Sequence, residues 1–320
     1  MKCRICGSAG PHREFRVKEM HFGTRQEFDY FQCAECDCLQ IVGIPADLSG
    51  YYPKDYYSTV PIDEKKYTGL RGLPRLFFFK ASLYQDSPLR QLISKIRANK
   101  HAASISGLGI TPRTRVLDVG CGNGGLFAYP LKQIGFESVA GCDPFLDRPM
   151  EYSNGLHLYQ NTLAEVPIEP KWDVITFHHS FEHVPNPSAT LHAVHRLLGD
   201  NGTCVIRIPT SSSFAWDHYG VNWVQLDAPR HLFLHSVESL RRVAQSAGFE
   251  VKSVRYDSDE FQFWGSENYL NGIPLKDQKK RGTNTRLAWL ILRWRLKFRS
   301  IKLNRQCRGD QAVFVLKKKG

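Results

Sequence analysis

The sequence lacks any apolar run of about 18 residues or more, the length that a membrane-spanning helix needs. It also lacks an apolar leader, because Lys2 and Cys3 follow Met1 directly. It contains no internal repeat, and its apolar and charged contents of 42% and 23% are ordinary for a globular protein. We therefore expect a folded cytoplasmic protein that is neither exported nor membrane-spanning.

Acidic residues are in short supply. The chain has 31 Asp and Glu residues against 43 Lys and Arg, which gives a net charge of +12. A surplus of this size favours polyanions, anionic lipid headgroups or phosphorylated substrates. It is equally compatible with a solvated basic surface that has no dedicated partner.

Cysteine, in contrast, is frequent and clustered. The nine cysteines include two C-x-x-C pairs, Cys3 with Cys6 and Cys33 with Cys36, whose four thiolates match a tetrahedral zinc site. A closed site of this kind leaves no position for water or substrate, so its role would be to fold a small module. Cys38 is an alternative ligand to Cys36, and unliganded core thiols are the simpler alternative.

The pattern along the chain predicts three regions. Residues 1–58 form a zinc-ribbon module that ends in a tyrosine-rich segment at 51–57, and residues 59–104 form a partly helical connector with a helix over 87–101. Residues 105–320 form an α/β domain with a helical insertion at 259–308 before its last strand.

Short apolar runs alternate with helical patterns in the α/β domain, which is typical of βαβ units and a Rossmann-like sheet. Ser236 is an expected N-cap. The seven expected strands cover 115–119, 138–143, 156–159, 172–178, 203–208, 250–257 and 311–316, and the expected helices cover 124–134, 188–198 and 237–247.

A glycine cluster directly follows the first of these strands. Gly120, Gly122 and Gly124 would let the backbone approach a ligand closely, and Asp143 ends the next strand, where a carboxylate can accept hydrogen bonds from ribose hydroxyls. A glycine turn alone has a purely steric explanation, but strand, loop, helix, strand and acid together indicate a nucleotide-type site. The dinucleotide fingerprint is not cleanly met after Gly120.

Residues 116–124 resemble the first motif of the class I S-adenosylmethionine-dependent methyltransferases, and landmarks at 172–175, 181–184, 197–202 and 247–249 follow in that family's order. The resemblance implies S-adenosylmethionine as the cofactor. By resemblance, Asp118, Gly120, Gly122 and Gly124 line its methionine side, Asp143 holds the ribose, Leu163 and Ala164 flank the adenine, and Cys121, Pro144 and His178 complete the set.

The chain departs from that family at two positions. Many relatives have an acid near Thr162, so the adenine contact here would come from the backbone or from Glu165. Pro130 lies deep in the expected first helix, where a kink is expected.

The order of cysteine module, tyrosine-rich segment and methyltransferase domain resembles a group that includes sugar C-methyltransferases and methyltransferases from glycan gene clusters. In that group the front module helps to enclose the substrate. The resemblance points to His183 and His231 near the reacting group, with His231 as the base, a task that suits histidine near neutral pH. Glu182 is a third candidate, and Glu182 and His183 have the alternative role of capping or orienting their loop. Arg230 stands where those relatives have an acid, which indicates an anionic acceptor.

The insertion contains a segment, 284–303, that combines tryptophans and leucines with clustered cations. Packing or oligomerisation is the simpler interpretation of this segment. Contact with the inner face of an anionic membrane is the alternative, and it would bring a lipid-linked glycan within reach.

These features predict a methyltransferase that acts on oxygen or carbon of a small-molecule acceptor, a sugar or glycan precursor. One alternative is a nucleic-acid methyltransferase, which the basic charge and the zinc module would suit, but no D/N-P-P-Y/F segment or Pro-Cys nucleophile follows the fourth expected strand. The other is a noncatalytic zinc-module binding protein with a vestigial cofactor site. The intact glycine cluster with Asp143 argues against it.

Overall fold

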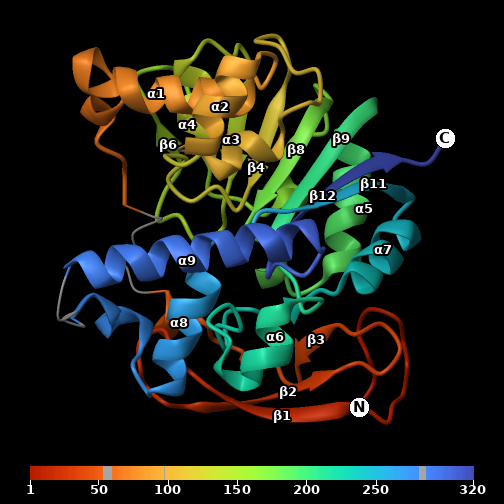
Figure 1. Ribbon diagram of the computed structural model, residues 1–320. Helices are drawn as coiled ribbons and strands as arrows, with labels where there is room; N and C mark the ends of the chain where they lie inside the picture. The colour runs from red at the N-terminus through yellow and green to blue at the C-terminus, as the bar shows by residue number, and fades with distance from the viewer. Residues whose placement is uncertain (53–59, 97, 281–285) are drawn as a thin grey trace.

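The computed structural model describes residues 1–52, 60–96, 98–280 and 286–320 and arranges them around two sheets (Figure 1). The larger sheet has the order β11-β12-β9-β8-β4-β5-β7-β6 within these residues, and the smaller has the order β1-β2-β3-β10. Residues 53–57 of the tyrosine-rich segment and the expected boundary at 58 and 59 lie outside the described residues.

The larger sheet is Rossmann-like at its centre. β4 is flanked by the parallel strands β5 and β8, whereas β12 runs antiparallel to both β9 and β11. Its strands are β4 (Val116–Val119), β5 (Val139–Cys142), β6 (Met150–Glu151), β7 (His157–Tyr159), β8 (Trp172–His178), β9 (Leu198–Pro209), β11 (Phe249–Tyr256) and β12 (Gln311–Lys318).

The expected count of seven strands is wrong by one in the described residues. All seven expected strands occur, and β6 adds an eighth at the edge, antiparallel to β7. A strand of two residues has no alternation of apolar and polar positions that a sequence pattern could reveal.

Helices cover both faces of this sheet (Figure 1). Because side chains alternate along a strand, Val116 and Leu117 point to opposite faces. Val116 lies in the core under α1 (Gly69–Leu83), α3 (Lys100–Ser104) and α4 (Ala128–Gln133), and Leu117 lies in the core under α5 (Pro187–Leu197) and α7 (Val237–Ser246). The Ser236 hydroxyl accepts a hydrogen bond from the Ser239 N–H, so the expected N-cap of α7 is confirmed.

Two expected helices have different bounds. The helix expected over 124–134 begins only at Ala128, because the glycine turn extends through Gly124, whose φ is +73°. Pro130 therefore lies in the first turn, where a missing N–H costs little and no kink is required. The helix expected over 87–101 is two helices, α2 (Pro88–Ile96) and α3, and the Asn99 side chain caps the second by accepting from the Ala102 N–H.

The smaller sheet is antiparallel and is completed by a distant segment. β1 (Arg13–Lys18), β2 (Glu27–Gln32) and β3 (Leu39–Ile41) come from the cysteine-rich region, but β10 (Phe233–Leu234) lies within the α/β domain in sequence, between β9 and β11. This sheet forms the lower layer of the molecule in Figure 1. The cysteine-rich region therefore shares its sheet with the loop that carries His231.

The insertion before the last strand is helical in its described part. It contains α8 (Phe261–Leu270) and the twenty-residue α9 (Arg286–Arg305), and α6 (Phe214–Tyr219) lies earlier in the chain, after β9. Among the described residues, no helix is both long enough and apolar enough to cross a membrane.

Candidate active site

The turn after β4 depends on glycine at its first position. Gly120 has a φ of +69°, and a Cβ placed there would lie 2.3 Å from the Ser180 Cβ. A side chain would therefore clash as well as strain the backbone. The turn leaves a surface of backbone atoms that a ligand can approach closely.

Asp143 follows β5 and faces this turn. One carboxylate oxygen accepts from the Gly122 N–H and the other from the Phe145 N–H, both at 2.9 Å. Burial raises the pKa of Asp143, and the two N–H donors oppose that shift. Each oxygen retains a lone pair, so the carboxylate can accept the ribose hydroxyls that the sequence analysis assigned to it.

Asp118 and His178 form a fixed pair beneath the turn. The Asp118 carboxylate accepts from the Thr176 hydroxyl at 2.7 Å and lies 3.1 Å from His178 Nδ1. His178 Nε2 in turn lies 2.9 Å from the hydroxyl of Ser104 in α3. Both side chains are buried and held at both ends, so they are suited to shape the methionine side of a cofactor site.

A cavity of about 1190 Å³ joins the glycine turn to the histidine candidates. This volume exceeds the roughly 300–1,000 Å³ typical of single-ligand pockets, so it can hold a cofactor and an acceptor together. Of the predicted cofactor residues, it is lined by Asp118, Gly120, Cys121, Gly122, Asp143, Pro144, Leu163, Ala164 and His178.

Among the described residues, Gly124 and Glu165 do not line the cavity, although the sequence indicated both as possible cofactor contacts. A Cβ on Gly124 would meet Leu156 and Leu158 at 3.3 Å, so this glycine serves the turn and its packing. Glu165 forms a capping box with Thr162, accepting from the Thr162 N–H at 2.8 Å and from its hydroxyl at 2.7 Å. Thr162 lines the cavity, whereas the Glu165 carboxylate is occupied by this cap.

His183 and His231 lie together at the other end of the cavity. Their ring centroids are 4.7 Å apart with the rings edge to face. His231 Nδ1 donates to the Gln225 carbonyl at 2.7 Å, and His183 Nδ1 donates to the Arg230 carbonyl at 2.8 Å. Because a carbonyl can only accept, each neutral ring carries its proton on Nδ1 and has its lone pair on Nε2.

Two carboxylates stand near the free nitrogen of His231. Its Nε2 lies 3.7 Å from an Asp227 oxygen and 3.9 Å from a Glu182 oxygen. Negative charge at this distance stabilises the imidazolium that forms when histidine takes a proton. His231 therefore has the tautomer and the electrostatic environment of a general base.

Glu182 acts from beneath the cavity. It is fully buried in the 3-10 turn Phe181–His183, and it does not belong to the described cavity wall. Burial alone would raise the pKa of Glu182, but His179, whose Nδ1 lies 3.4 Å from a Glu182 oxygen, and the nearby His183 and His231 bring that pKa to about 2. Glu182 is thus a buried, charged group next to the three histidines.

Glu182, His183 and His231 are also arranged as possible metal ligands. Glu182, His183 and His231 each offer one ligand atom, and these atoms lie within 4.8 Å of one another. Carboxylate and imidazole groups suit a divalent cation, so this cluster could hold one. The resemblance already placed these three residues near the reacting group, but no metal-ligand spacing in the sequence indicated a cation site, because His231 comes from a separate loop.

Arg230 is buried and has internal partners. Its guanidinium donates to the Asp227 carboxylate and lies 2.6 Å from His21 Nδ1. Burial would raise the pKa of Asp227, but Arg230, His231 and His21 lower it to about 2. The positive charge of Arg230 is thus matched within the protein, which weakens the argument that this residue selects an anionic acceptor.

Sequence reasoning missed His21, Tyr52 and Asp227 as site residues. All three line the cavity, and His21 and Tyr52 come from the cysteine-rich region. The Tyr52 hydroxyl lies 3.1 Å from His183 Nδ1, and the Tyr52 ring stacks on Phe145 at 4.6 Å. The one available signal was that Asp227 lies four residues before His231, the expected base.

The four cysteines of the two C-x-x-C pairs converge at one point of the smaller sheet. Cys3 and Cys36 have their sulfur atoms 3.7 Å apart, Cys6 and Cys33 have theirs 3.5 Å apart, and all four lie within 4.8 Å of one another. Four thiols at these separations fit a tetrahedral zinc ion. Cys38 is buried outside this group, with its sulfur directed to the Leu39 carbonyl.

Comparison with known proteins gives one family match. A family model described as a methyltransferase domain matches residues 84–254. The ubiquinone biosynthesis O-methyltransferase of Psychrobacter arcticus is 28% identical over 232 residues, which cover 63% of this chain and 87% of that protein. Its namesake in Psychrobacter cryohalolentis is 31% identical over 219 residues, which cover 59% and 82%.

A solved structure also shows similarity. A methyltransferase dependent on S-adenosylmethionine from Archaeoglobus fulgidus shares 20% identity, with coverage of 76% of this chain and 99% of that chain and a TM-score of 0.42.

Proposed function

The chain belongs to the methyltransferase domain family, and from this premise we propose that it methylates a hydroxyl oxygen of a small-molecule acceptor, with His231 as the base. S-adenosylmethionine, the methyl donor, supplies an electrophilic methyl group when it is bound. The choice of oxygen over carbon is supported by relatives that are named O-methyltransferases.

The observation that carries this proposal is the position of His231 in the same cavity as the glycine turn and Asp143. A hydroxyl placed against His231 Nε2 can lose its proton to that nitrogen as its oxygen attacks the methyl group. The Gln225 carbonyl holds the ring in the required tautomer, and Asp227 and Glu182 stabilise the charge that results.

A sugar or glycan precursor is the acceptor class within this proposal. The smaller sheet and the segment after it bring His21 and Tyr52 to the cavity wall, as the likeness to sugar methyltransferases implies for the front module. Val224, Phe261 and Leu275 add apolar surface at the same end. With Arg230 matched by Asp227, a neutral acceptor fits this wall better than an anionic one.

Structural zinc at Cys3, Cys6, Cys33 and Cys36 is a separate part of the proposal and is supported by the convergence of their sulfur atoms. A peripheral location at the inner face of the membrane is a third part, and it depends on α9.

The reaction is tested with His231→Gln and with His218→Gln as a matched control on an exposed histidine outside the cavity. Methyl transfer from radiolabelled S-adenosylmethionine is measured against a panel of sugars, nucleotide sugars and phenols. We expect His231→Gln to lose a factor of about 10² to 10⁴ in kcat, as for other general bases, with cofactor affinity unchanged by calorimetry.

Three outcomes would contradict parts of this proposal. Full activity in His231→Gln would exclude it as the base, and absence of cofactor binding in the wild type would exclude the enzyme altogether. Activity that disappears with a chelator and returns with Mg²⁺ or Mn²⁺ would assign Glu182, His183 and His231 to a metal ion instead.

A further inference from the structure

Helix α9 packs on the protein along a narrow line. Ser300 and Leu303 are buried and Leu296 is half-buried, whereas most of its residues from 290 to 302 are exposed. At about 100° per residue, these three positions share one side of the helix. The other side of α9 faces away from the protein.

That outer side is apolar. Trp294 and Phe298 are 60% and 61% exposed, and Leu290, Ile291 and Ile301 are exposed beside them. The five residues fall within a sector of about 100°, nearly opposite the buried line. Exposed apolar surface of this kind marks a binding site when it is contiguous.

Cations border this apolar stripe on both sides. Arg293 and Lys297 lie along one border, and Arg295 and Lys302 lie along the other. No Asp or Glu occurs in the sequence from 286 to 305. The stripe is therefore an apolar surface framed by positive charge.

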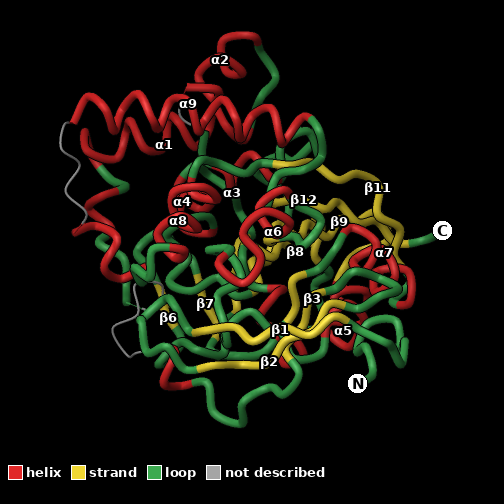
Figure 2. The backbone as a smooth tube through the Cα atoms, turned by 60° about the horizontal axis from the view of Figure 1, so that its bottom comes forward, coloured by secondary structure: helices red, strands yellow, loops and turns green. Residues whose placement is uncertain are grey.

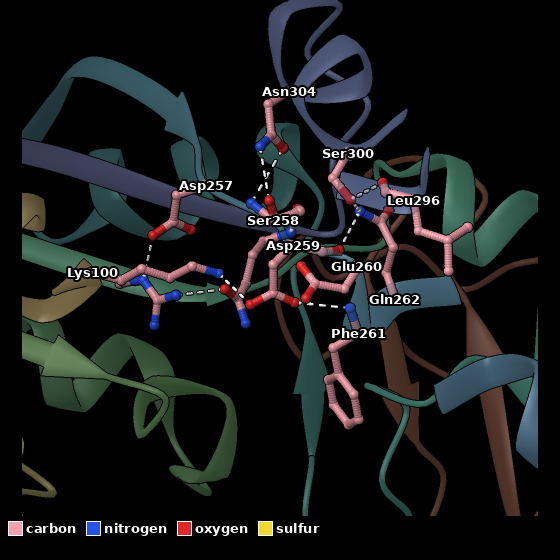
Figure 3. Close-up of polar contacts among 12 residues, drawn as sticks. Lys100, Asp257, Ser258, Asp259, Glu260, Phe261, Gln262, Leu296, Ser300 and Asn304 are labelled. Atoms are coloured by element: carbon pink, nitrogen blue, oxygen red, sulfur yellow. Dashed lines mark hydrogen bonds and ion pairs between the residues drawn. The ribbon is translucent and has the colours of Figure 1, made fainter. Parts of the chain in front are cut away.

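The catalytic domain fixes the direction in which the stripe faces (Figure 3). Asn304 exchanges two hydrogen bonds with the backbone of Ser258, at 2.9 and 3.2 Å, and Gln262 donates to the Ser300 hydroxyl at 3.3 Å. Arg293 pairs with Glu260 in the same segment. These contacts hold the buried line against the domain, so the stripe points outward.

We propose that α9 lies flat on an anionic membrane surface, with its apolar stripe at the boundary between headgroups and acyl chains. Interfacial helices have this arrangement, in which aromatic and aliphatic residues enter the lipid while flanking cations contact anionic headgroups. The sequence-based segment 284–303 included residues 284 and 285, which lie outside the described residues. The proposal rests on the peripheral location in the proposed function and names the helix and the lipid chemistry involved, and it does not depend on methyl transfer or on the acceptor.

Charge distinguishes the membrane from a second copy of the chain. A two-fold contact between two such stripes would place the borders of one helix against those of the other, and both borders are cationic. Like charges that face each other across an interface repel. An anionic surface removes this repulsion and can pair with Arg295, Lys297 and Lys302, whereas Arg293 already pairs with Glu260.

The helices α1 and α2 also expose apolar side chains. α1 exposes Leu70, Leu73 and Phe77, and α2 exposes Leu89 and Leu92. In Figure 2 these two helices and α9 lie along the upper margin of the molecule.

The test is sedimentation with vesicles of phosphatidylcholine alone and with vesicles that also contain about 30% phosphatidylglycerol. We expect the wild type to bind the anionic vesicles and to be released by salt. Trp294→Ser with Phe298→Ser should lower the partition coefficient at least about ten-fold. Arg295→Gln and Lys302→Gln should each lower it about five-fold, because one cation near the surface contributes about that factor.

Ile168→Ser is the control, since Ile168 is an apolar residue outside α9 that is 52% exposed, and vesicle binding of this variant should equal that of the wild type. The Trp294 side chain should enter lipid, so vesicles should shift the protein's fluorescence to the blue, and Trp294→Phe should remove that shift. A wild type that ignores anionic vesicles would overturn the proposal. So would a wild-type dimer that the α9 variants convert to monomers without any vesicle binding.

Discussion

The Asp143 carboxylate is held by two backbone N–H groups before any ligand arrives. Because its geometry is fixed, hydrogen bonds to ribose hydroxyls would cost little further ordering. We expect Asp143→Asn to weaken S-adenosylmethionine binding by about ten- to a hundred-fold, since hydrogen bonds to a charged group contribute about 1.5–3 kcal/mol. Calorimetry measures this, with exposed Asp147→Asn as the control.

The pH dependence of binding follows from the same carboxylate. Burial raises the pKa of Asp143, so it takes up a proton at a higher pH than an ordinary aspartate. The protonated form accepts fewer hydrogen bonds, so affinity should be full near neutral pH and fall as the pH decreases through the raised pKa. An affinity that is constant between neutral pH and pH 4 would contradict this role.

Residues that lie close together in sequence could be predicted, and residues that meet only by folding could not. The glycine turn and Asp143 belong to one βαβ unit, so their spacing alone indicated a cofactor site. His21 and Asp227 are separated by more than two hundred residues and meet at 3.8 Å across the cavity wall. No local pattern records such a contact.

At the scale of elements, the same limit separates strong patterns from short ones. The strand over 172–178 was predicted to the residue, because a buried run of apolar side chains is unmistakable in a parallel sheet. β10 has two residues, and its pairing with β3 is set by the sheet it completes. Because β10 was not predicted, the sequence did not indicate that the cysteine-rich region shares a sheet with the loop that carries His231.

Tyr30 in β2 connects the cysteine-rich region directly to His231. It is fully buried, and its hydroxyl donates to the His231 carbonyl at 2.9 Å. Tyr30→Phe leaves a buried carbonyl without this donor, a cost of about 1–3 kcal/mol. We expect a lower kcat through displacement of His231, with cofactor affinity unchanged. Tyr51→Phe, which loses a hydrogen bond to Gln26 at the surface, is the control, and an equal effect of both variants would exclude positioning through Tyr30.

The cysteine site should stabilise the smaller sheet as a unit. We expect one zinc ion per chain by elemental mass spectrometry, and its loss in Cys33→Ser, because three thiolates leave the tetrahedral site incomplete. Chelation should then expose the thiols to modifying reagents and lower activity, since His21 and Tyr30 depend on this region. Exposed Cys307→Ser should keep the metal, and wild-type protein purified without zinc would contradict the assignment.

At the scale of the whole molecule, buried histidines should make stability depend on pH. Burial lowers the pKa of His183 and of His235 to about 4, and Glu182 opposes the shift in both cases. Unfolded histidine has a pKa of about 6.5, so the unfolded chain takes up these protons first as the pH falls. Protonation of these two histidines therefore leaves the free energy of unfolding unchanged above about pH 6.5 and lowers it progressively between about pH 6.5 and about pH 4.

A comparison of stability at pH 7.5 and at pH 5 separates the effect of these histidines from that of the carboxylates Glu182 and Asp227. Glu182 and Asp227 have a pKa of about 2, so the stability they contribute is lost only below about pH 4, where the unfolded carboxyls protonate. Asp310 acts in the opposite direction, because burial raises its pKa to about 6 and it binds its proton earlier in the folded state. Between pH 7.5 and pH 5, Asp310 should raise the free energy of unfolding by about 1 kcal/mol, whereas each of the two histidines should lower it by about 2 kcal/mol.

The net expectation is that the free energy of unfolding, measured in urea, falls between pH 7.5 and pH 5. His235 separates this cause from others, because it is fully buried between Phe181 and Phe233 and remote from the acceptor end of the cavity wall. His235→Asn removes one titrating group and should reduce the pH-dependent loss by about 2 kcal/mol, although the variant is less stable overall. Exposed His218→Gln should leave the loss unchanged. An undiminished loss in His235→Asn would show that the acid sensitivity arises elsewhere in the fold.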